Sequence, residues 1–346
     1  MKAAYKANRN KGIEVRDVPI PKISSNEVLV KVKKAAICGT DIHLYEWNNW
    51  CENVNAKNPM VIGHEFCGEV VEVGINVNLI KEGDLVAGET HITCGHCIMC
   101  RTGKQHICQN MKIIGVHTDG AFAEYIKIPE ICAWKLPKDT PPEVGAIYEP
   151  FGIAVHAVLK CKIANQSVAI IGCGPIGLFA VNVASISGAR KVFAVDVNKY
   201  RLDIAKKMGN NVETLNPAAN NDVNKIIKEE TKGYGADVVI ELSGSVKGIQ
   251  MGFEILKKTG NIILVGLASE NISLDLVNNV IYKEATIYGV TGREMFDTWY
   301  MAERLIRSGK CNIRDVLTHK FVFNRIREAI LIAKEGNCGK PIIEIS

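Results

Sequence analysis

The feature that most constrains the fold is a glycine-rich turn between two short apolar runs. The first run, Ser167–Ile171, is followed by the turn, by a helical pattern and by a second apolar run, Lys191–Val195. This order predicts a strand, a helix and a second strand parallel to the first. Parallel strands need helices on both faces of their sheet, so we expect an α/β fold with a doubly wound sheet.

Each glycine of the turn has a steric reason to be there. Gly172 allows a sharp turn, Gly174 lets the backbone approach a pyrophosphate, and Gly177 lets the helix lie close to the strand. Pro175 and Ile176 begin the helix, whose first N–H groups can bind phosphate. A glycine-rich turn without a ligand is the alternative, and the flanking strands with the acidic residue that follows favour a dinucleotide site.

Asp196 and Arg201, which both follow the second apolar run, affect whether the site prefers NAD or NADP. Asp196 directly follows that run, where a carboxylate accepts hydrogen bonds from a ribose diol and repels a 2'-phosphate. The pattern therefore favours NAD over NADP, unless Asp196 only caps the next helix. Arg201 is assigned to the same pocket, and its positive charge complicates this expectation.

Residues 168–189 carry no charge and are long enough to suggest a membrane span. Gly172 to Pro175 would break such a helix in its first third, and the remainder is too short to cross a bilayer. We therefore expect no membrane partner.

The N-terminus lacks the apolar core of a signal peptide, which predicts a cytoplasmic protein. In that compartment its twelve cysteines are expected to be thiols or metal ligands.

The composition, with 346 residues of which 47% are apolar and 23% charged, suits two domains and excludes disordered or fibrous chains. The net charge of +5 is modest and the lysines are scattered. This gives no reason to expect a nucleic-acid partner.

Four cysteines, Cys94, Cys97, Cys100 and Cys108, lie close together in the sequence. Four thiolates suit a closed, structural zinc site that clamps a polar loop. An iron–sulfur cluster fits less well, because the last spacing is longer than in ferredoxins and no proline follows. Four ordinary reduced cysteines are the other alternative.

A second set, Cys38, His64 and Glu65, offers a thiolate, an imidazole and a carboxylate. Such a set leaves a fourth zinc position open, as a catalytic zinc needs. Spacing alone does not decide between this site and a buried cysteine with a core histidine.

The first 130 residues show short alternating strands separated by glycine turns, which predict a small β-barrel.

The order of these features resembles the zinc-dependent medium-chain alcohol dehydrogenase family, over nearly the whole chain. The resemblance implies a GroES-like β-barrel catalytic domain (1–152 and 294–346) and a Rossmann NAD-binding domain (153–293). It also implies NAD and two zinc ions per chain, and a homotetramer. Six residues match functional positions of the family: the zinc ligands Cys38, His64 and Glu65, the proton relay Thr40 and His43, and the acidic residue beside the metal, Glu149.

Other functions remain open for some of these matches. Thr40 could simply cap a helix, His43 could be a solvated helix residue, and Glu149 could lie unpaired at a domain boundary.

Further along the chain, four apolar runs at 212–214, 237–241, 260–265 and 286–290 complete six strands. Loops after such strands line a cofactor crevice, so we expect nicotinamide contacts, or else core packing, at Val265, Gly266, Leu267, Val290 and Thr291.

Within the family, residues 38–47, 88–97, 149–152 and 292–300 are similar to members that oxidise the 3-hydroxyl of L-threonine. A small-molecule substrate, L-threonine, is therefore expected, with a polyol or 2,3-butanediol as the alternative. Arg293 and His91 are candidates to bind or shape the pocket around a zwitterion. Thr90, Ile153 and residues 290–291 depart from the family pattern. A third possibility, a zinc knuckle with a nucleotide sensor, is disfavoured by the dispersed charge.

Overall fold

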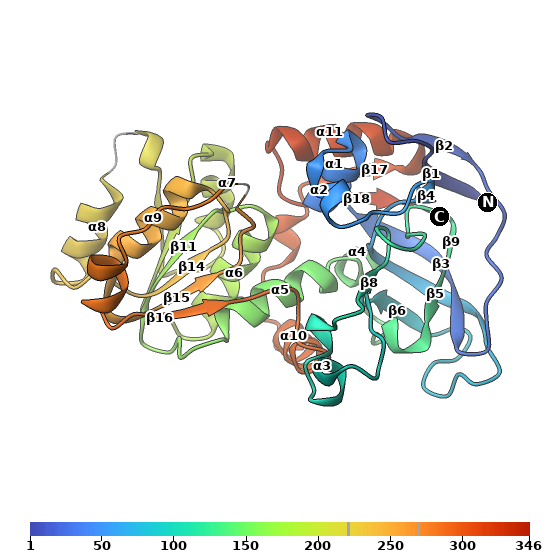
Figure 1. Cartoon of the computed structure of the whole chain (residues 1–346), viewed down its shortest axis with the longest axis horizontal. Helices are drawn as coiled ribbons and strands as arrows, with labels where there is room; N and C mark the ends of the chain where they lie inside the picture. The colour runs from blue at the N-terminus through green and yellow to red at the C-terminus, as the bar shows by residue number, and fades with distance from the viewer. Residues whose placement is uncertain (220–221, 269) are drawn as a thin grey trace. The chain divides into compact units, whose positions relative to one another are not determined.

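The computed structural model describes residues 1–219, 222–268 and 270–346, and the chain forms two compact units (Figure 1). The first unit contains Met1–Glu149 and Leu317–Ser346, and the second contains Pro150–Val316. The sequence places these boundaries after residues 152 and 293, so residues 294–316 here group with the second unit. Within the described ranges, no helix is long and apolar enough to span a membrane.

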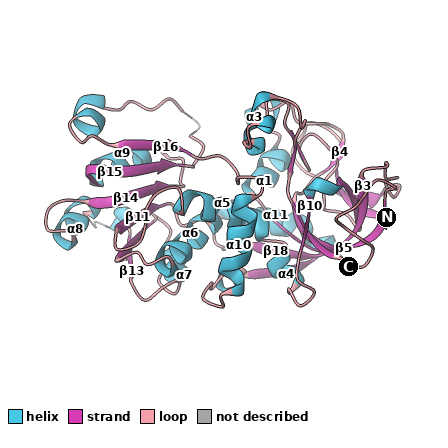
Figure 2. Cartoon of the chain, turned by 90° about the horizontal axis from the view of Figure 1, so that it is seen from below, coloured by secondary structure: helices cyan, strands magenta, loops and turns pink. Residues whose placement is uncertain are grey.

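The second unit is built on a parallel sheet in the order β13-β12-β11-β14-β15-β16, part of which Figure 2 shows edge-on. Its strands are β11 (Ser167–Ile171), β12 (Lys191–Val195), β13 (Val212–Leu215), β14 (Ala236–Glu241), β15 (Leu256–Leu264) and β16 (Thr286–Gly289). All five residues of β11 are buried, as expected for a strand covered on both faces. The chain changes direction across the sheet between β11 and β14, where doubly wound folds bind dinucleotides.

Helices connect these strands or lie before the first and after the last of them in the chain. They are α5 (Tyr148–Val158), which begins in the first unit, α6 (Pro175–Ile186), α7 (Lys199–Ala205), α8 (Val223–Glu230), α9 (Val246–Ile255) and α10 (Asp297–Arg307). Side chains of Asn198, Asp222 and Ser245 cap the starts of α7, α8 and α9. By contrast, α6 begins after Gly174 without a side-chain cap, which leaves N–H groups of its first turn available.

The first unit contains a curved sheet in the order β10-β6-β5-β3-β18-β17, with β9 also paired to β3. Its strands are β3 (Glu27–Ala36), β5 (Glu65–Val73), β6 (Leu85–Gly88), β9 (Tyr125–Pro129), β10 (Ala133–Lys135), β17 (His319–Val322) and β18 (Pro341–Glu344). Smaller sheets are formed by β1 (Lys2–Lys6), β2 (Glu14–Asp17) and β4 (Met60–Val61), and by β7 (His91–Ile92) and β8 (Lys112–Ile113). The predicted fold class is confirmed.

The helices of the first unit are short. They are α1 (Gly39–Glu46), α2 (Asn49–Asn53), α3 (Ile98–Arg101), α4 (Pro142–Gly145) and α11 (Ile326–Glu335). Helix α11 lies between β17 and β18 in the chain. Its buried residues Ile326, Ala329 and Ile330 have helical spacing, a signal that the sequence prediction missed. Single turns of other helix types lie at Gln105–Ile107, Glu130–Cys132, Pro217–Ala219, Val277–Ile281, Arg314–Val316 and Phe323–Arg325.

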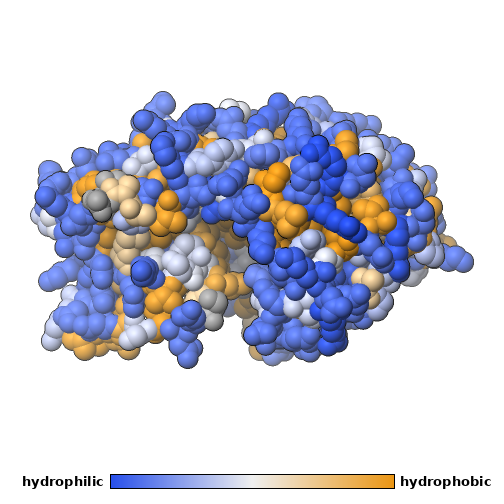
Figure 3. Space-filling view, turned by 90° about the horizontal axis from the view of Figure 1, so that it is seen from above, coloured by the Kyte–Doolittle hydropathy of each residue, from blue (hydrophilic) through white to orange (hydrophobic). Residues whose placement is uncertain are grey.

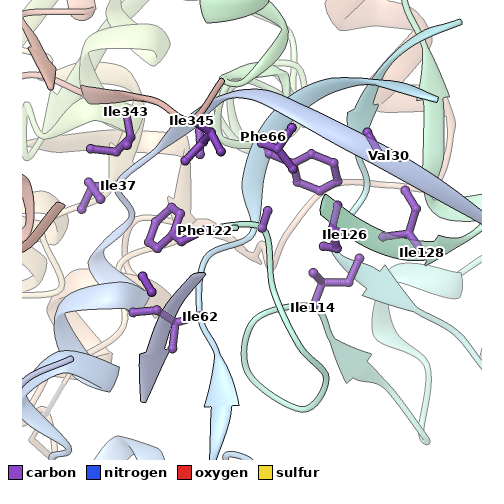
Figure 4. Close-up of a cluster of buried hydrophobic side chains, with 14 of the residues drawn as sticks. Val30, Ile37, Ile62, Phe66, Ile114, Phe122, Ile126, Ile128, Ile343 and Ile345 are labelled. Atoms are coloured by element: carbon purple, nitrogen blue, oxygen red, sulfur yellow. The ribbon is translucent and has the colours of Figure 1, made fainter. Parts of the chain in front are cut away.

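In the core of the first unit, Phe66 and Phe122 lie among aliphatic side chains (Figure 4). Phe66 and Phe122 are almost completely buried there. Gly63 has a φ of 96°, and a Cβ at this position would lie 2.4 Å from the ring of Phe122. Glycine therefore lets the chain pass this ring just before His64 and the start of β5.

The surface carries apolar patches between hydrophilic residues, as the face in Figure 3 shows. In the second unit, the exposed apolar side chains near edge strand β16 are Leu276, Val277, Ile281, Tyr282 and Ile287. Strand β16 pairs with β15 on one side only. An unpaired strand edge with neighbouring apolar side chains is suited to pairing with another chain.

We expect Gly177→Ala to lower the free energy of unfolding by roughly 1–3 kcal/mol, because overpacking has this effect. A Cβ at Gly177 would lie 1.9 Å from the carbonyl oxygen of Gly172, whereas one at Gly174 meets no atom within 4 Å. The matched control is Gly174→Ser, since serine also suits the first position before a helix. Urea unfolding should show a loss for the first variant alone, and equal stability would contradict the close helix–strand contact.

Candidate functional site

The sheet register of the first unit brings one set of predicted ligands together. Ala36, at the end of β3, pairs with Glu65 of β5 on one side and with β18 on the other. Cys38 follows β3 by two residues, and Lys340 directly precedes β18. The ligand atoms of Cys38, His64 and Glu65 lie within 4.8 Å of one another, so the structure does place these three residues in one cluster.

Burial makes this cluster a good site for a cation. Glu65 is fully buried and its Oε2 has no hydrogen-bond partner among the described residues. A buried carboxylate oxygen without a partner is unfavourable. A zinc ion bound by thiolate, imidazole and carboxylate would satisfy it and keep one position open, so the residues fit a catalytic zinc.

The pKa values of His64 and Glu65 also indicate that this cluster favours a bound positive charge. Burial lowers the pKa of His64, but the negative charges of Cys38 and Asp41 outweigh this effect and raise it to about 10. Burial raises the pKa of Glu65 to about 7, although Lys340 opposes the shift. A proton on His64 thus supplies positive charge, and a metal ion that binds this imidazole must displace the proton.

Two residues that orient the ligands were not assigned this role from the sequence. Asp41 is fully buried, and its Oδ2 accepts a hydrogen bond of 2.8 Å from the Cys38 N–H. Its Oδ1 lies 3.8 Å from His64 Nδ1, beyond hydrogen-bond distance, and its negative charge contributes to raising the pKa of this imidazole. Lys340 donates to Glu65 Oε1 at 2.7 Å and to the Ile37 carbonyl at 2.9 Å. Such partners fix the orientation of metal ligands.

Glu149 lies beside this cluster at the start of α5. Its side chain is buried, and Thr90 Oγ1 donates a hydrogen bond of 3.4 Å to its Oε1. The negative charge of Glu149 is among the causes that raise the pKa of Glu65, after burial. Thr90, one of the departures from the family pattern, thus contacts the acidic residue expected next to the metal.

The two predicted relay residues lie on one face of α1, because Thr40 and His43 are three positions apart. The His43 ring stacks on Trp50 with 5.3 Å between ring centroids, and its Nδ1 lies 2.6 Å from Asn48 Nδ2. Burial lowers the pKa of His43. The ring is therefore held by contacts on one face and one edge.

The structure also brings the four cysteines of the second set together. The Sγ–Sγ distances are 3.5 Å for Cys97–Cys100, 3.8 Å for Cys97–Cys108 and 3.5 Å for Cys94–Cys108. Tetrahedral zinc with four thiolates separates its sulfur atoms by about 3.8 Å, as follows from Zn–S bonds near 2.3 Å. Backbone N–H groups, first that of His96, lower the pKa of Cys94 to about 5, which favours the thiolate that a metal requires.

His91 and Arg293, the candidates for the substrate pocket, have different surroundings. His91 is half-buried, and its Nδ1 and backbone N–H contact Glu89 Oε1 at 2.7 and 2.8 Å. Arg293 is fully buried in the second unit, with its guanidinium over the Trp299 ring. A Cβ at Gly152 would lie 2.7 Å from Arg293 Cδ. These contacts give Arg293 a packing role, and its carboxylate-binding role stays a prediction.

In the second unit, the glycine turn has the shape of a phosphate site. Gly172 has a φ of 93°, and a Cβ there would lie 2.6 Å from the Ser243 nitrogen. Gly174 faces open space, and α6 starts at Pro175, followed by Ile176. An anion can therefore approach the helix N-terminus through a space that a larger side chain at Gly174 would fill. The residues fit a dinucleotide pyrophosphate.

Asp196 connects this turn to the end of β12 rather than capping α7. Its Oδ2 accepts a hydrogen bond of 2.6 Å from Cys173 N–H, and its Oδ1 accepts one of 2.8 Å from Asn198 N–H. The cap of α7 is Asn198. Arg201 lies on α7, and its Nε is buried without a hydrogen-bond partner among the described residues. Asp196 and Arg201 thus lie near the turn with opposite charges.

A further residue that the sequence did not reveal is Glu241, fully buried at the end of β14. Its carboxylate accepts hydrogen bonds from Ser243 and from the Gly244 N–H, while its carbonyl accepts from Val265 and Gly266. Glu241 therefore joins the loops after β14 and β15.

The predicted nicotinamide contacts lie at the sheet edge or in these loops. Among them, Leu267 and Thr291 are exposed and Val290 is buried.

Comparison with known proteins agrees with this geometry. Residues 24–138 match the alcohol dehydrogenase GroES-like domain, and residues 175–308 match the zinc-binding dehydrogenase family. An L-threonine 3-dehydrogenase from Caldanaerobacter subterraneus subsp. tengcongensis is 45% identical over 99% of this chain and 98% of its own length.

Solved structures are similar over the full length. The 2R,3R-butanediol dehydrogenase of Bacillus subtilis is 30% identical, with a TM-score of 0.89, over 100% of this chain and 99% of its own. A zinc-binding dehydrogenase from Sinorhizobium meliloti bound to NADP is 29% identical, with a TM-score of 0.89, over 99% of this chain and 98% of its own. The resemblance seen in the sequence is confirmed, and the chain belongs to the family of zinc-binding alcohol dehydrogenases.

Proposed function

We propose that the chain catalyses the NAD-dependent oxidation of the L-threonine 3-hydroxyl to 2-amino-3-oxobutanoate, with release of NADH and a proton. The observation that carries this proposal is the 45% identity to an L-threonine 3-dehydrogenase over 99% of the chain. The cluster of Cys38, His64 and Glu65 and the glycine turn supply the two sites that such a reaction needs.

In this proposal Cys38, His64 and Glu65 hold a catalytic zinc, the four cysteines hold a structural zinc, and the glycine turn with Asp196 holds NAD. The catalytic zinc supplies a Lewis acid for an alcohol oxygen, and NAD supplies an acceptor for two electrons. Arg201 and the loop residues Val265, Gly266, Leu267, Val290 and Thr291 stay proposed cofactor contacts.

The chain's own side chains orient the ligands and move the proton. Lys340 holds Glu65 and Asp41 holds the Cys38 backbone by hydrogen bonds, so the open side of the cluster has a defined direction. Thr40 Oγ1 both accepts and donates hydrogen bonds, so it can take the substrate proton while passing its own onward. His43, on the same face of α1, then returns a proton to solvent. Glu149, held by Thr90, is an acceptor for the substrate ammonium.

A second candidate substrate is a vicinal diol. The observation in its favour is the full-length similarity to the butanediol dehydrogenase, at 30% identity and a TM-score of 0.89. The same zinc ligands and relay would serve either alcohol, because the reacting group is a secondary hydroxyl in both. The two substrates differ in charge, since threonine brings a carboxylate and an ammonium that need partners when buried.

We expect kcat/KM for L-threonine to exceed that for 2,3-butanediol or sorbitol at saturating NAD. His91→Ala should lower kcat/KM for threonine by roughly 10-fold or more, as loss of a hydrogen bond to a charged group does, and change the diol rate less. NADH affinity of the same variant, measured by fluorescence, is the control. A diol that outperforms threonine in the wild type would contradict the substrate assignment.

Metal analysis of the purified protein should find two zinc ions per chain. Cys38→Ser should lose one zinc and nearly all activity, because it removes a ligand of the open site. Cys100→Ser should lose the other zinc and lower stability, because a closed site contributes to folding. Cys161→Ser, at a half-buried cysteine outside both sets, should retain both ions. One zinc per chain, unchanged by Cys100→Ser, would be evidence against the structural site.

Asp196→Ala should reduce the preference for NAD over NADP by about 10-fold or more, because it removes repulsion of a 2'-phosphate and leaves Arg201 to attract it. Steady-state kinetics with both cofactors measure the ratio. Gly174→Ser should weaken both cofactors equally, since its side chain fills the space near the helix N-terminus. An unchanged ratio in Asp196→Ala would show that this carboxylate does not select the cofactor.

A homotetramer and a cytoplasmic location stay predictions of the sequence. The edge of β16 and the exposed Ile287 support pairing of two chains across a two-fold axis. Light scattering should give four times the chain mass of 37.9 kDa, and Ile287→Lys should give smaller assemblies. A monomer mass for the wild type would rule the tetramer out.

A further inference from the structure

We propose that Asn48 is a positioning residue for His43: it holds the imidazole in the tautomer with the proton on Nε2 and opposes protonation of Nδ1. The relay histidine then gives up an acquired proton readily. The inference rests on the proposed function only for the relay role of His43, whereas the polarity of the hydrogen bond follows from the contacts of these residues.

The orientation of the Asn48 amide is fixed by a helix cap. Asn48 is the residue before α2, and its Oδ1 accepts a hydrogen bond of 3.2 Å from the Trp50 N–H. If the amide were turned over, its NH2 group would face the Trp50 N–H, so two donors would meet and the cap would be lost. The NH2 group is therefore the part of Asn48 that faces His43.

The orientation of the His43 ring is fixed as well. Its Nδ1 lies 2.6 Å from Asn48 Nδ2, and its face stacks on Trp50 with an interplanar angle of 26°. Turning the ring over would place a carbon atom at this short distance and remove the hydrogen bond. Because Asn48 donates here, Nδ1 must be the acceptor, and a neutral imidazole then carries its proton on Nε2.

Most of the charged groups around α1 are engaged with partners other than His43. The titratable and charged side chains on α1 and on the segments near it are Lys6, Arg9, Lys11, Asp41, Glu46, Cys51, Glu52, Arg327 and Lys334. Glu46 pairs with Lys11 and Lys334, and Glu52 pairs with Arg9 and with the Trp47 indole.

Three further groups contact the backbone or the cluster of Cys38, His64 and Glu65. Lys6 donates to the Tyr45 carbonyl and Cys51 to the His43 carbonyl, while Asp41 faces Cys38 and His64. In the described part of the chain, no ion pair involves the His43 imidazole. The Asn48 amide is therefore the polar group that sets which ring nitrogen carries the proton.

The consequence for the relay concerns the lifetime of the protonated ring. A proton taken up on Nδ1 replaces the hydrogen bond from Asn48 by a contact between two donors. The imidazolium is disfavoured, so the proton passes on to water and both ring and amide return to the bonded arrangement. Oxidation releases one proton per turnover, and a relay group with a low pKa does not retain it.

The test is the titration of His43 in the wild type, Asn48→Ser and Asn48→Asp, followed by NMR of protein labelled with 13C-histidine. Serine and aspartate both cap helices well, so α2 is retained in each variant. Serine removes the donor to Nδ1, and aspartate replaces it by an acceptor that stabilises the imidazolium. His43→Gln assigns the signal among the eight histidines.

We expect the His43 midpoint to rise from the wild type through Asn48→Ser to Asn48→Asp, with a total shift of about one pH unit or more, as for a carboxylate close to a histidine. The acidic limb of the kcat/KM profile with L-threonine should shift upward with it, and this shift should vanish in the His43→Gln background. Equal midpoints, or a lower midpoint in Asn48→Asp, would overturn the proposal. The titration needs no substrate, so a failure of threonine oxidation would count against the proposed function alone.

Discussion

The buried ion pair between Glu65 and Lys340 is the interaction on which the cluster of Cys38, His64 and Glu65 depends. Both side chains are almost fully buried, and burying either charge without its partner would be strongly unfavourable. Lys340 engages one oxygen of Glu65 and leaves the other without a hydrogen-bond partner. The ion pair thus offsets only part of the cost of burying the Glu65 carboxylate. A cation bound next to Cys38 and His64 would interact favourably with the unpaired oxygen.

This arrangement explains why the ligand set is built at strand ends. β5 and β18 both pair with the end of β3, so residues from three distant parts of the sequence meet without a long loop. Strand pairing fixes the backbone, and Lys340 holds the Glu65 side chain. A metal site needs both a fixed backbone and fixed side chains, because ligands that are correctly placed but free to rotate bind a metal weakly.

The sequence predicted the parts of the molecule that local patterns determine. The glycine turn, the six parallel strands and the four cysteines all depend on residues close in the chain, and each has steric or chemical reasons that a short window contains. Lys340 could not be found in this way, because it lies 275 residues from Glu65 and lysine is usually a surface residue. Glu241 was taken as the end of an apolar strand, and its function in joining two loops emerged only from the fold.

A short helix carries much of the proposed chemistry of the first unit, and its stability is coupled to the site. Helix α1 has eight residues, too few to be stable alone, and contains Asp41, Thr40 and His43. The bond from Cys38 N–H to Asp41 Oδ2 caps this helix, while the other oxygen of the same carboxylate faces His64.

The other end of α1 is held by Lys6, whose pKa burial lowers to about 8. Lys6 donates to the Tyr45 carbonyl in the last turn, an acceptor that a helix end leaves open, and also to the Gly12 carbonyl. Beyond this end, Asn48 caps α2 with one atom and binds His43 with another. Helix ends and site geometry therefore share the same hydrogen bonds, and a change at Asp41 or Asn48 acts on both at once.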